Sequence, residues 1–311
     1  MEKNNYIPWV EKYRPKYFSN IVLDENNFTI LNNIIDNNTF PNLLLYGPPG
    51  TGKTTTIINL IENYQKNLNQ LNKGLMIHLN ASDERGIDII RNQINSFVSS
   101  NSFFKEGIKF VILDEVDYMT KNAQLALKYL IQEYNYNVRF ILICNYISKV
   151  DNTLQNEFVK LTFSNQPVND IISFLQNINN SEQLNLTEDE IKSIQENYKS
   201  DMRSMINFMQ TNQNSINGLK IITHHVLDNI NFYIEKRNFD EFSDFVDSIT
   251  INYNIDIKNI IKNYINYFVR LESSNVNEDL INKIEYILHN LDMNTIYLKK
   301  YFFYSFSKVK V

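Results

Sequence analysis

The feature that most constrains the fold of this chain is a glycine-rich run, Gly47-Pro48-Pro49-Gly50-Thr51-Gly52-Lys53-Thr54. The run fits the pattern GxxxxGK[ST], whose glycines let backbone N–H groups turn inward around phosphates. A short apolar run, Leu43 to Tyr46, precedes it, and a helical stretch from Lys53 to about Lys66 follows it. Strand, loop and helix in this order point a helix N-terminus at an anion. The sequence therefore predicts a nucleotide phosphate site.

Two residues of this loop and two carboxylates downstream carry the expected chemistry. Lys53 offers a point charge to the outer phosphates, and Thr54 offers a hydroxyl to Mg²⁺. A buried strand, 110–113, leads into Asp114 and Glu115. We expect Asp114 to hold Mg²⁺, directly or through water, and Glu115 to orient and polarise the attacking water. The apolar strand before them argues against a merely solvated strand end.

A further polar residue, Asn145, ends the apolar run 140–144. In a parallel sheet its side chain would lie beside Asp114, near the terminal phosphate. An asparagine after a strand is more commonly a turn residue, so by itself this position leaves both interpretations open.

Apolar strands alternate with helical segments in the first half of the chain, which predicts a parallel sheet covered by helices on both faces. The expected strands lie at 43–46, 74–79, 110–113 and 140–143, and helices at about 87–98 and 123–134 follow two of them. After about residue 166 only helices are expected, at 170–177, 188–198 and 201–210 and then from about 218 onward. Apolar stripes at 257–271 and 280–291 indicate helix packing. We expect an α/β domain at 1–165, a small helical domain at 166–217 and a helical domain at 218–311.

The net charge of −5 argues against nucleic-acid binding by the molecule as a whole, so any DNA contact needs a local basic patch or several chains together. The single cysteine, Cys144, excludes an internal disulfide. The sequence has neither a run of 18 apolar residues nor an apolar signal segment at its N-terminus. We therefore expect a soluble intracellular protein with no membrane partner.

Several segments together resemble the small subunits of replication factor C, within the AAA+ ATPases. The segments are Pro8–Lys16, Asn80–Asp88 with its continuation to Ile94, Leu113–Thr120 with Ala123–Leu127, Asn145, and Asp201–Arg203. The resemblance runs from residue 8 to about 210. Beyond that it rests on length and helical pattern. It implies an AAA+ phosphate-loop domain, a helical lid and an all-α collar that holds the oligomer together.

The resemblance also assigns roles around the nucleotide. It places an N-terminal box near the adenine, which implicates Val10, Arg14, Ile21 and Val22. It adds Thr55 beside the loop and makes Asn145 a sensor of the γ-phosphate. Arg203 would reach the same phosphate from the lid. The implied cofactors are ATP and Mg²⁺.

The implied assembly is a heteropentameric ring that opens a sliding clamp and places it on primed DNA, independently of sequence. Helices after the second and third strands would face DNA, so Arg85, Arg91, Gln124 and Lys128 become expected contacts. From the sequence alone, Arg85 and Arg91 fit a solvated helix face equally well.

One departure from the family pattern concerns hydrolysis. Family small subunits usually carry Ser-Arg-Cys after the first sensor, and that arginine reaches into the neighbouring subunit's site. Here the stretch is Asn156-Glu157-Phe158, and no arginine lies between residues 140 and 202. Lys149 and Lys160 lack the planar fork of arginine. Either this finger position faces no working site or a gap, or the neighbouring site binds ATP without hydrolysing it. We adopt the first hypothesis.

Three functions compete. The leading one is a subunit that hydrolyses ATP at a site completed by another chain. The second is a scaffold subunit that binds nucleotide with little turnover. The third, another AAA+ DNA machine, would lack the Asn80–Asp88 segment and the N-terminal box. The expected location is the nucleus in a eukaryotic cell, and otherwise the cytoplasm or a viral replication site.

Overall fold

The computed structural model describes residues 7–82, 89–99, 107–134, 136–164, 166–213, 221–253, 255–271, 278–290 and 293–307, with the backbone alone for 89–91. The chain forms two compact units. The first consists of Met1–Gln183 with Tyr198–Thr211, and the second of Leu184–Asn197 with Asn212–Val311. These bounds differ from the three domains expected from the sequence, and that division stays a prediction.

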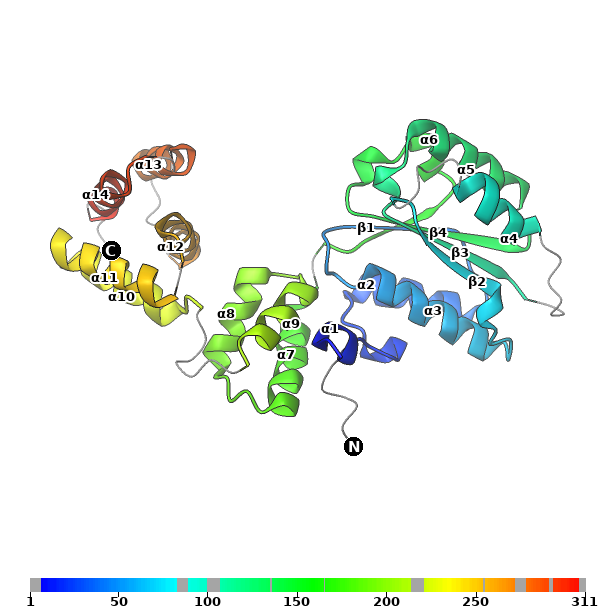
Figure 1. The fold of residues 1–311 in the computed structure, drawn as a ribbon, viewed down its shortest axis with the longest axis horizontal. Coiled ribbons are helices and arrows are strands. Elements are labelled where there is room, and N and C mark those ends of the chain that lie inside the picture. Colours follow the sequence, from blue (N-terminus) through cyan, green and yellow to red (C-terminus); the bar gives the residue numbers. More distant parts are fainter. Residues whose placement is uncertain are drawn as a thin grey trace. The chain divides into compact units, whose positions relative to one another are not determined.

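A five-stranded parallel sheet forms the centre of the first unit (Figure 1). Its strands are β1 (Leu43–Tyr46), β2 (Met76–Asn80), β3 (Lys109–Asp114), β4 (Val138–Cys144) and β5 (Val159–Thr162). Their order across the sheet is β2-β3-β4-β1-β5. The apolar residues of β1, β3 and β4 are almost all buried, as expected for central strands covered on both faces.

Successive residues of these strands point to opposite faces, and each face has its own apolar core. On one face, Leu43 and Leu45 pack with residues of α2 (Glu25–Asp36) and α3 (Lys53–Asn67). On the other face, Leu44 packs with residues of α4 (Asn95–Ser99), α5 (Lys121–Glu133) and α6 (Asn152–Gln155). Figure 1 shows the two sets of helices on opposite sides of the sheet. The predicted parallel sheet between helices is confirmed.

The N-terminal segment with the short helix α1 (Trp9–Lys12) is held in place by two helices of the first unit, α7 (Val168–Glu182) and α9 (Met202–Thr211). The backbone N–H of Trp9 donates to Gln210 Oε1 at 3.0 Å. Lys12 Nζ lies 2.5 Å from Glu182 Oε1, and the Tyr13 hydroxyl donates to the same carboxylate. The N-terminal segment is thereby fastened to both α7 and α9.

The second unit is helical. It contains most of α8 (Glu188–Tyr198), then α10 (His224–Glu235), α11 (Phe239–Tyr253), α12 (Ile257–Leu271), α13 (Glu278–His289) and α14 (Thr295–Phe306). The apolar stripe predicted for α12 is buried from Ile257 to Phe268 in the core with residues of the other C-terminal helices, whereas its last residue, Leu271, is exposed. The stripe predicted for α13 is only partly correct, because Leu280 and Ile287 are buried whereas Ile281 and Leu288 are exposed. Within the described ranges, no helix has the length and apolar character needed to cross a membrane.

Two expectations about secondary structure need correction. Strand β5 was not predicted, although it closes one edge of the sheet. The helix expected over about 87–98 begins outside the described residues, and its described part is a π-helical segment, Ile89–Ile94, followed by the short α4. The wider π-helical turn changes which residues of this segment share a face.

Candidate nucleotide-binding site

A cavity of about 450 Å³ opens at the carboxyl ends of the strands in the first unit. In open parallel sheets, ligands bind at this edge. Nearly all the residues predicted for the nucleotide line it: Val10, Arg14, Ile21, Val22, Pro49, Gly50, Thr51, Gly52, Lys53, Thr54, Thr55, Asp114, Glu115, Asn145 and Arg203. The structure therefore brings together side chains from segments up to about 190 residues apart, as the sequence predicted.

The glycine-rich loop lies against the start of α9. Gly50 has a φ of +75° and Gly52 a φ of +84°, which glycine adopts without strain. The backbone N–H of Met202 donates to the Gly50 carbonyl at 3.1 Å. The carboxylate of Asp201 accepts hydrogen bonds from the Ser204 N–H and hydroxyl, and so caps α9. The neighbouring Arg203 is thereby placed at the cavity wall.

The ammonium group of Lys53 lies on the inner side of the loop. Its Nζ donates to the carbonyls of Gly47 and Pro48 at 2.8 and 2.7 Å and to Asn145 Oδ1 at 3.2 Å. Gly47 and Pro48, the two predicted loop residues absent from the cavity lining, thus act through Lys53. Burial lowers the pKa of Lys53, and the nearby Asp114 carboxylate opposes that shift. A cation between the loop and Asn145 suits the outer phosphates of a nucleotide.

Asp114 ends β3 with both carboxylate oxygens engaged. Its Oδ2 accepts from the Thr54 hydroxyl at 2.7 Å, and its Oδ1 accepts from the Glu115 N–H at 2.9 Å. Burial alone would raise the pKa of Asp114, but the approach of His78 and the hydrogen bonds from Thr54 and Glu115 together lower it. Asp114 is therefore an anion at neutral pH.

The residues around Asp114 fit Mg²⁺. Among the described side chains, no group of three or more His, Cys, Asp or Glu is placed to hold a metal alone. A magnesium ion next to phosphates needs only one or two protein oxygens, since phosphate oxygens and water complete its shell. Thr54 Oγ1 and Asp114 Oδ2, already 2.7 Å apart, supply such a pair.

Glu115 has an uncommon backbone conformation, with φ +57° and ψ +37°. This left-handed region costs a non-glycine residue about 1–3 kcal/mol and is concentrated at functional sites. The conformation directs the chain from β3 into the turn Val116–Tyr118, and Glu115 itself lines the cavity.

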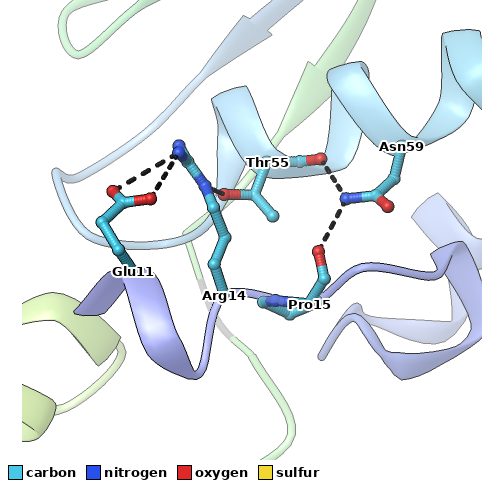
Figure 2. Close-up of polar contacts among 5 residues, drawn as sticks. All are labelled: Glu11, Arg14, Pro15, Thr55 and Asn59. Carbon is cyan, nitrogen blue, oxygen red and sulfur yellow. Dashed lines mark hydrogen bonds and ion pairs between the residues drawn. The ribbon is translucent and has the colours of Figure 1, made fainter. Parts of the chain in front are cut away.

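The N-terminal segment is fixed on α3, the helix that follows the loop (Figure 2). Arg14 Nε donates to Thr55 Oγ1 at 3.2 Å, and Arg14 Nη1 lies 3.2 Å from Glu11 Oε2. The amide of Asn59 donates to the carbonyls of both Pro15 and Thr55. These contacts hold Arg14 at the cavity.

Sequence reasoning missed several residues of this cavity: His78, Phe174, Met202, Ile206 and Gln166. The buried Gln166 amide donates to Thr51 O at 2.7 Å and to Val22 O at 2.9 Å. It therefore joins the phosphate loop to the predicted adenine segment. No local pattern marks Gln166, whereas His78 could have been found as a polar residue on a strand beside Asp114.

The structure bears on only two of the four predicted DNA contacts. Arg85 lies outside the described residues, as does the side chain of Arg91. Lys128 lies half-buried on α5 and stays a prediction. Gln124 needs correction, since it is 2% exposed. Its amide donates to the carbonyls of Met119 and Lys149 and accepts from the Asp151 N–H, so it has a structural role rather than a DNA contact.

The segment Asn156–Phe158, which carries Glu157 where the family usually has its arginine finger, lies just after α6. Glu157 Oε1 accepts a hydrogen bond from Gln132 Nε2 on α5 at 2.8 Å. The next residue, Phe158, is buried in the apolar core on that face of the sheet. The acidic side chain is thus held near the surface on a well-packed segment.

Comparison with known proteins gives consistent results. Residues 43–166 match the family described as "ATPase family associated with various cellular activities (AAA)". Over 205 residues, 66% of this chain, the sequence is 40% identical to replication factor C subunit 5 of Homo sapiens and covers 60% of it. It is 39% identical over 206 residues to replication factor C subunit 3 of Saccharomyces cerevisiae, covering 66% of this chain and 59% of the relative. The chain thus spans about three fifths of the length of these relatives.

Proposed function

We propose that this chain binds and hydrolyses ATP as one subunit of a clamp loader in DNA replication. The proposal proceeds from its AAA ATPase segment at residues 43–166 and from its similarity, over 66% of its length, to small subunits of replication factor C. The partners of the chain would be other clamp-loader subunits, a sliding clamp and primed DNA. In a eukaryotic cell this work would take place in the nucleus.

One observation carries the proposal: Lys53, Thr54, Asp114, Glu115, Asn145 and Arg203 line a single cavity next to the glycine-rich loop. Phosphoryl transfer depends on positioning and on neutralising negative charge, so it needs this combination of cations, a metal ligand pair and a carboxylate. A bound Mg²⁺ would neutralise charge on the phosphate oxygens.

The chain's own residues would then divide the work. The loop amides and Lys53 bind the phosphates, and Thr54 with Asp114 holds the metal. Glu115 accepts a hydrogen bond from the attacking water and polarises it. Asn145, which already contacts Lys53 at 3.2 Å, fixes the position of that cation beside the terminal phosphate. Arg203 supplies a second positive charge from the start of α9.

Full hydrolytic activity would require a further positive charge from a neighbouring subunit. Arginine fingers supplied in this way contribute about 10³–10⁵ in rate in related enzymes. This chain presents Glu157 at the corresponding place and cannot offer the same help to its own neighbour. We therefore propose that its finger position faces no working ATP site, or a gap in the ring.

Titration of the purified chain with ATP in the presence of Mg²⁺ tests the binding step. Lys53→Met is expected to weaken ATP binding roughly 10- to 150-fold, the loss of about 1.5–3 kcal/mol from a charged hydrogen bond. Lys66→Met, an exposed position on the same helix, is the matched control and should bind like the unaltered chain. Equal binding by all three proteins would reject this site.

A further inference from the structure

The cation side of the cavity contains a nitrogen donor, His78. This residue is on β2 and lines the same cavity as Thr54 and Asp114. Its Nε2 lies 3.8 Å from Asp114 Oδ2, the oxygen that also accepts the Thr54 hydrogen bond. Side chains from two separate elements, His78 of β2 and Thr54 of α3, therefore converge on one carboxylate oxygen of β3.

The sheet register explains why His78 reaches this point. His78 pairs with Ile112 on β3, so Asp114 lies two residues further along on the same face. Residues two apart on a strand are separated by about 7 Å along it, a span that the histidine and aspartate side chains together can bridge. The His78 side chain is 38% exposed and does not belong to the buried core.

The donor chemistry at this point is unusual for magnesium. Mg²⁺ is a hard ion that takes oxygen ligands in a nearly ideal octahedron. Imidazole nitrogen binds first-row transition ions more readily than it binds Mg²⁺, and Mn²⁺ is the ion of that series whose octahedral, oxygen-rich sites most resemble those of Mg²⁺. Adjacent ligands of an octahedral ion with bonds of about 2.1 Å are about 3 Å apart. His78 Nε2 lies 3.8 Å from Asp114 Oδ2, so a rotation that shortened this distance by about 0.8 Å would give the octahedral separation.

We propose that His78 is a third protein donor of the cation site and that it shifts the preference of this site from Mg²⁺ toward Mn²⁺. The inference rests on the proposed function, because nucleotide phosphates complete the ligand set. In the alternative, His78 only donates a hydrogen bond to Asp114. Replacing His78 would then lower the affinities for Mn²⁺ and Mg²⁺ by the same factor and leave their ratio unchanged.

Pulsed electron paramagnetic resonance of Mn²⁺ with ADP provides the direct test. In chain whose histidines carry ¹⁵N, the bound Mn²⁺ is expected to show a ¹⁵N coupling. The coupling should vanish in His78→Gln and persist in His225→Gln, an exposed histidine of the second unit. Absence of a ¹⁵N coupling in the unaltered protein overturns the inference without relying on any variant.

Competition titrations give a second readout. The affinity of the ADP-bound site for Mn²⁺ relative to Mg²⁺ is expected to fall about tenfold in His78→Gln, in the range found when a group supporting a metal site is lost. An unchanged ratio overturns the inference while leaving nucleotide binding intact. Failure of Mn²⁺ and ADP to bind the unaltered chain at all would instead reject the proposed function, so the two failures are distinguishable.

Discussion

Gly50 and Asp201 are in direct contact: a Cβ added at Gly50 would stand 1.8 Å from Asp201 Oδ1. Because Asp201 caps α9 and the next N–H donates to the Gly50 carbonyl, the phosphate loop and the helix that carries Arg203 are positioned by one contact. The geometry of the loop and the placement of Arg203 are therefore not independent.

Gly50→Ala is expected to disturb both the phosphate loop and the placement of Arg203. A side chain at φ +75° costs about 1–3 kcal/mol, and the methyl group must also displace Asp201. We expect a lower free energy of unfolding and at least tenfold weaker ATP binding, measured by denaturant titration and calorimetry. Gly74→Ala is the control, because its Cβ would meet only Asn72 Oδ1, at 3.2 Å. Equal effects at the two glycines would contradict the account.

Gln166→Leu tests the link between the loop and the adenine segment. The substitution leaves the carbonyls of Thr51 and Val22 without their buried donor, at about 1–3 kcal/mol for each unsatisfied group. We expect reduced thermal stability and weaker binding of ATP. An excess of ATP should partly restore the thermal stability by mass action, whereas the lower affinity remains. Gln132→Leu, an exposed position on α5, should change neither measurement appreciably. Unaltered ATP affinity in Gln166→Leu would show that the link is dispensable.

The thiol of Cys144 reports on the integrity of the site. Burial, with the negative charge of Asp117 nearby, raises the pKa of Cys144 from 9.0 to about 12, although Lys53 opposes the shift. At pH 8 we expect a thiol reagent to label the native chain at least 100-fold more slowly than the unfolded chain. Labelling at the unfolded rate would show that β4 is open to solvent.

The same pKa shift predicts a pH dependence of stability. The folded state keeps the Cys144 proton to higher pH than the unfolded state, whose thiol titrates near 9.0. Its contribution to stability is thus complete below about pH 9 and falls as the pH rises toward 12. Cys144→Ala should flatten that part of the curve in alkaline denaturation.

Glu157→Arg tests the assignment of the ring position. The side chain makes one surface hydrogen bond to Gln132, so its replacement should change stability by no more than about 0.5 kcal/mol. In a ring assembled with partner subunits, we expect total ATP turnover to change less than twofold. Glu157→Gln controls for the loss of negative charge. A rise of tenfold or more in the arginine variant alone would show that the finger faces a working site.

The sequence predicted those parts of the fold that depend on local pattern. The glycine-rich loop, the buried strands β1, β3 and β4, and the stripe on α12 have strong local signals. They lie where expected, except that Leu271 at the end of the stripe is exposed. Strand β5 was missed because only one of its four residues is buried. Val159, Lys160 and Thr162 are exposed, so the segment has no apolar run that would mark it as a strand.

The residues of the site that belong to a sequence motif could be predicted. Those that reach the site only through tertiary packing could not. Lys53, Asp114 and Asn145 belong to patterns visible in the chain. Gln166 enters the cavity wall only because β5 and α7 place it behind the loop. Gln124 looked available on the predicted helix, but the connection after β4 covers it and uses its amide.

ATP turnover by the purified chain, alone and with partner subunits, clamp and primed DNA, tests the central claim most directly. We predict little turnover by the chain alone and activation in the mixture. Glu115→Gln in this chain should remove its share of that activity while leaving ATP binding intact, because Glu115 polarises water rather than holding phosphate. Unchanged activity of the mixture containing Glu115→Gln would contradict the account and make this chain a nucleotide-binding scaffold.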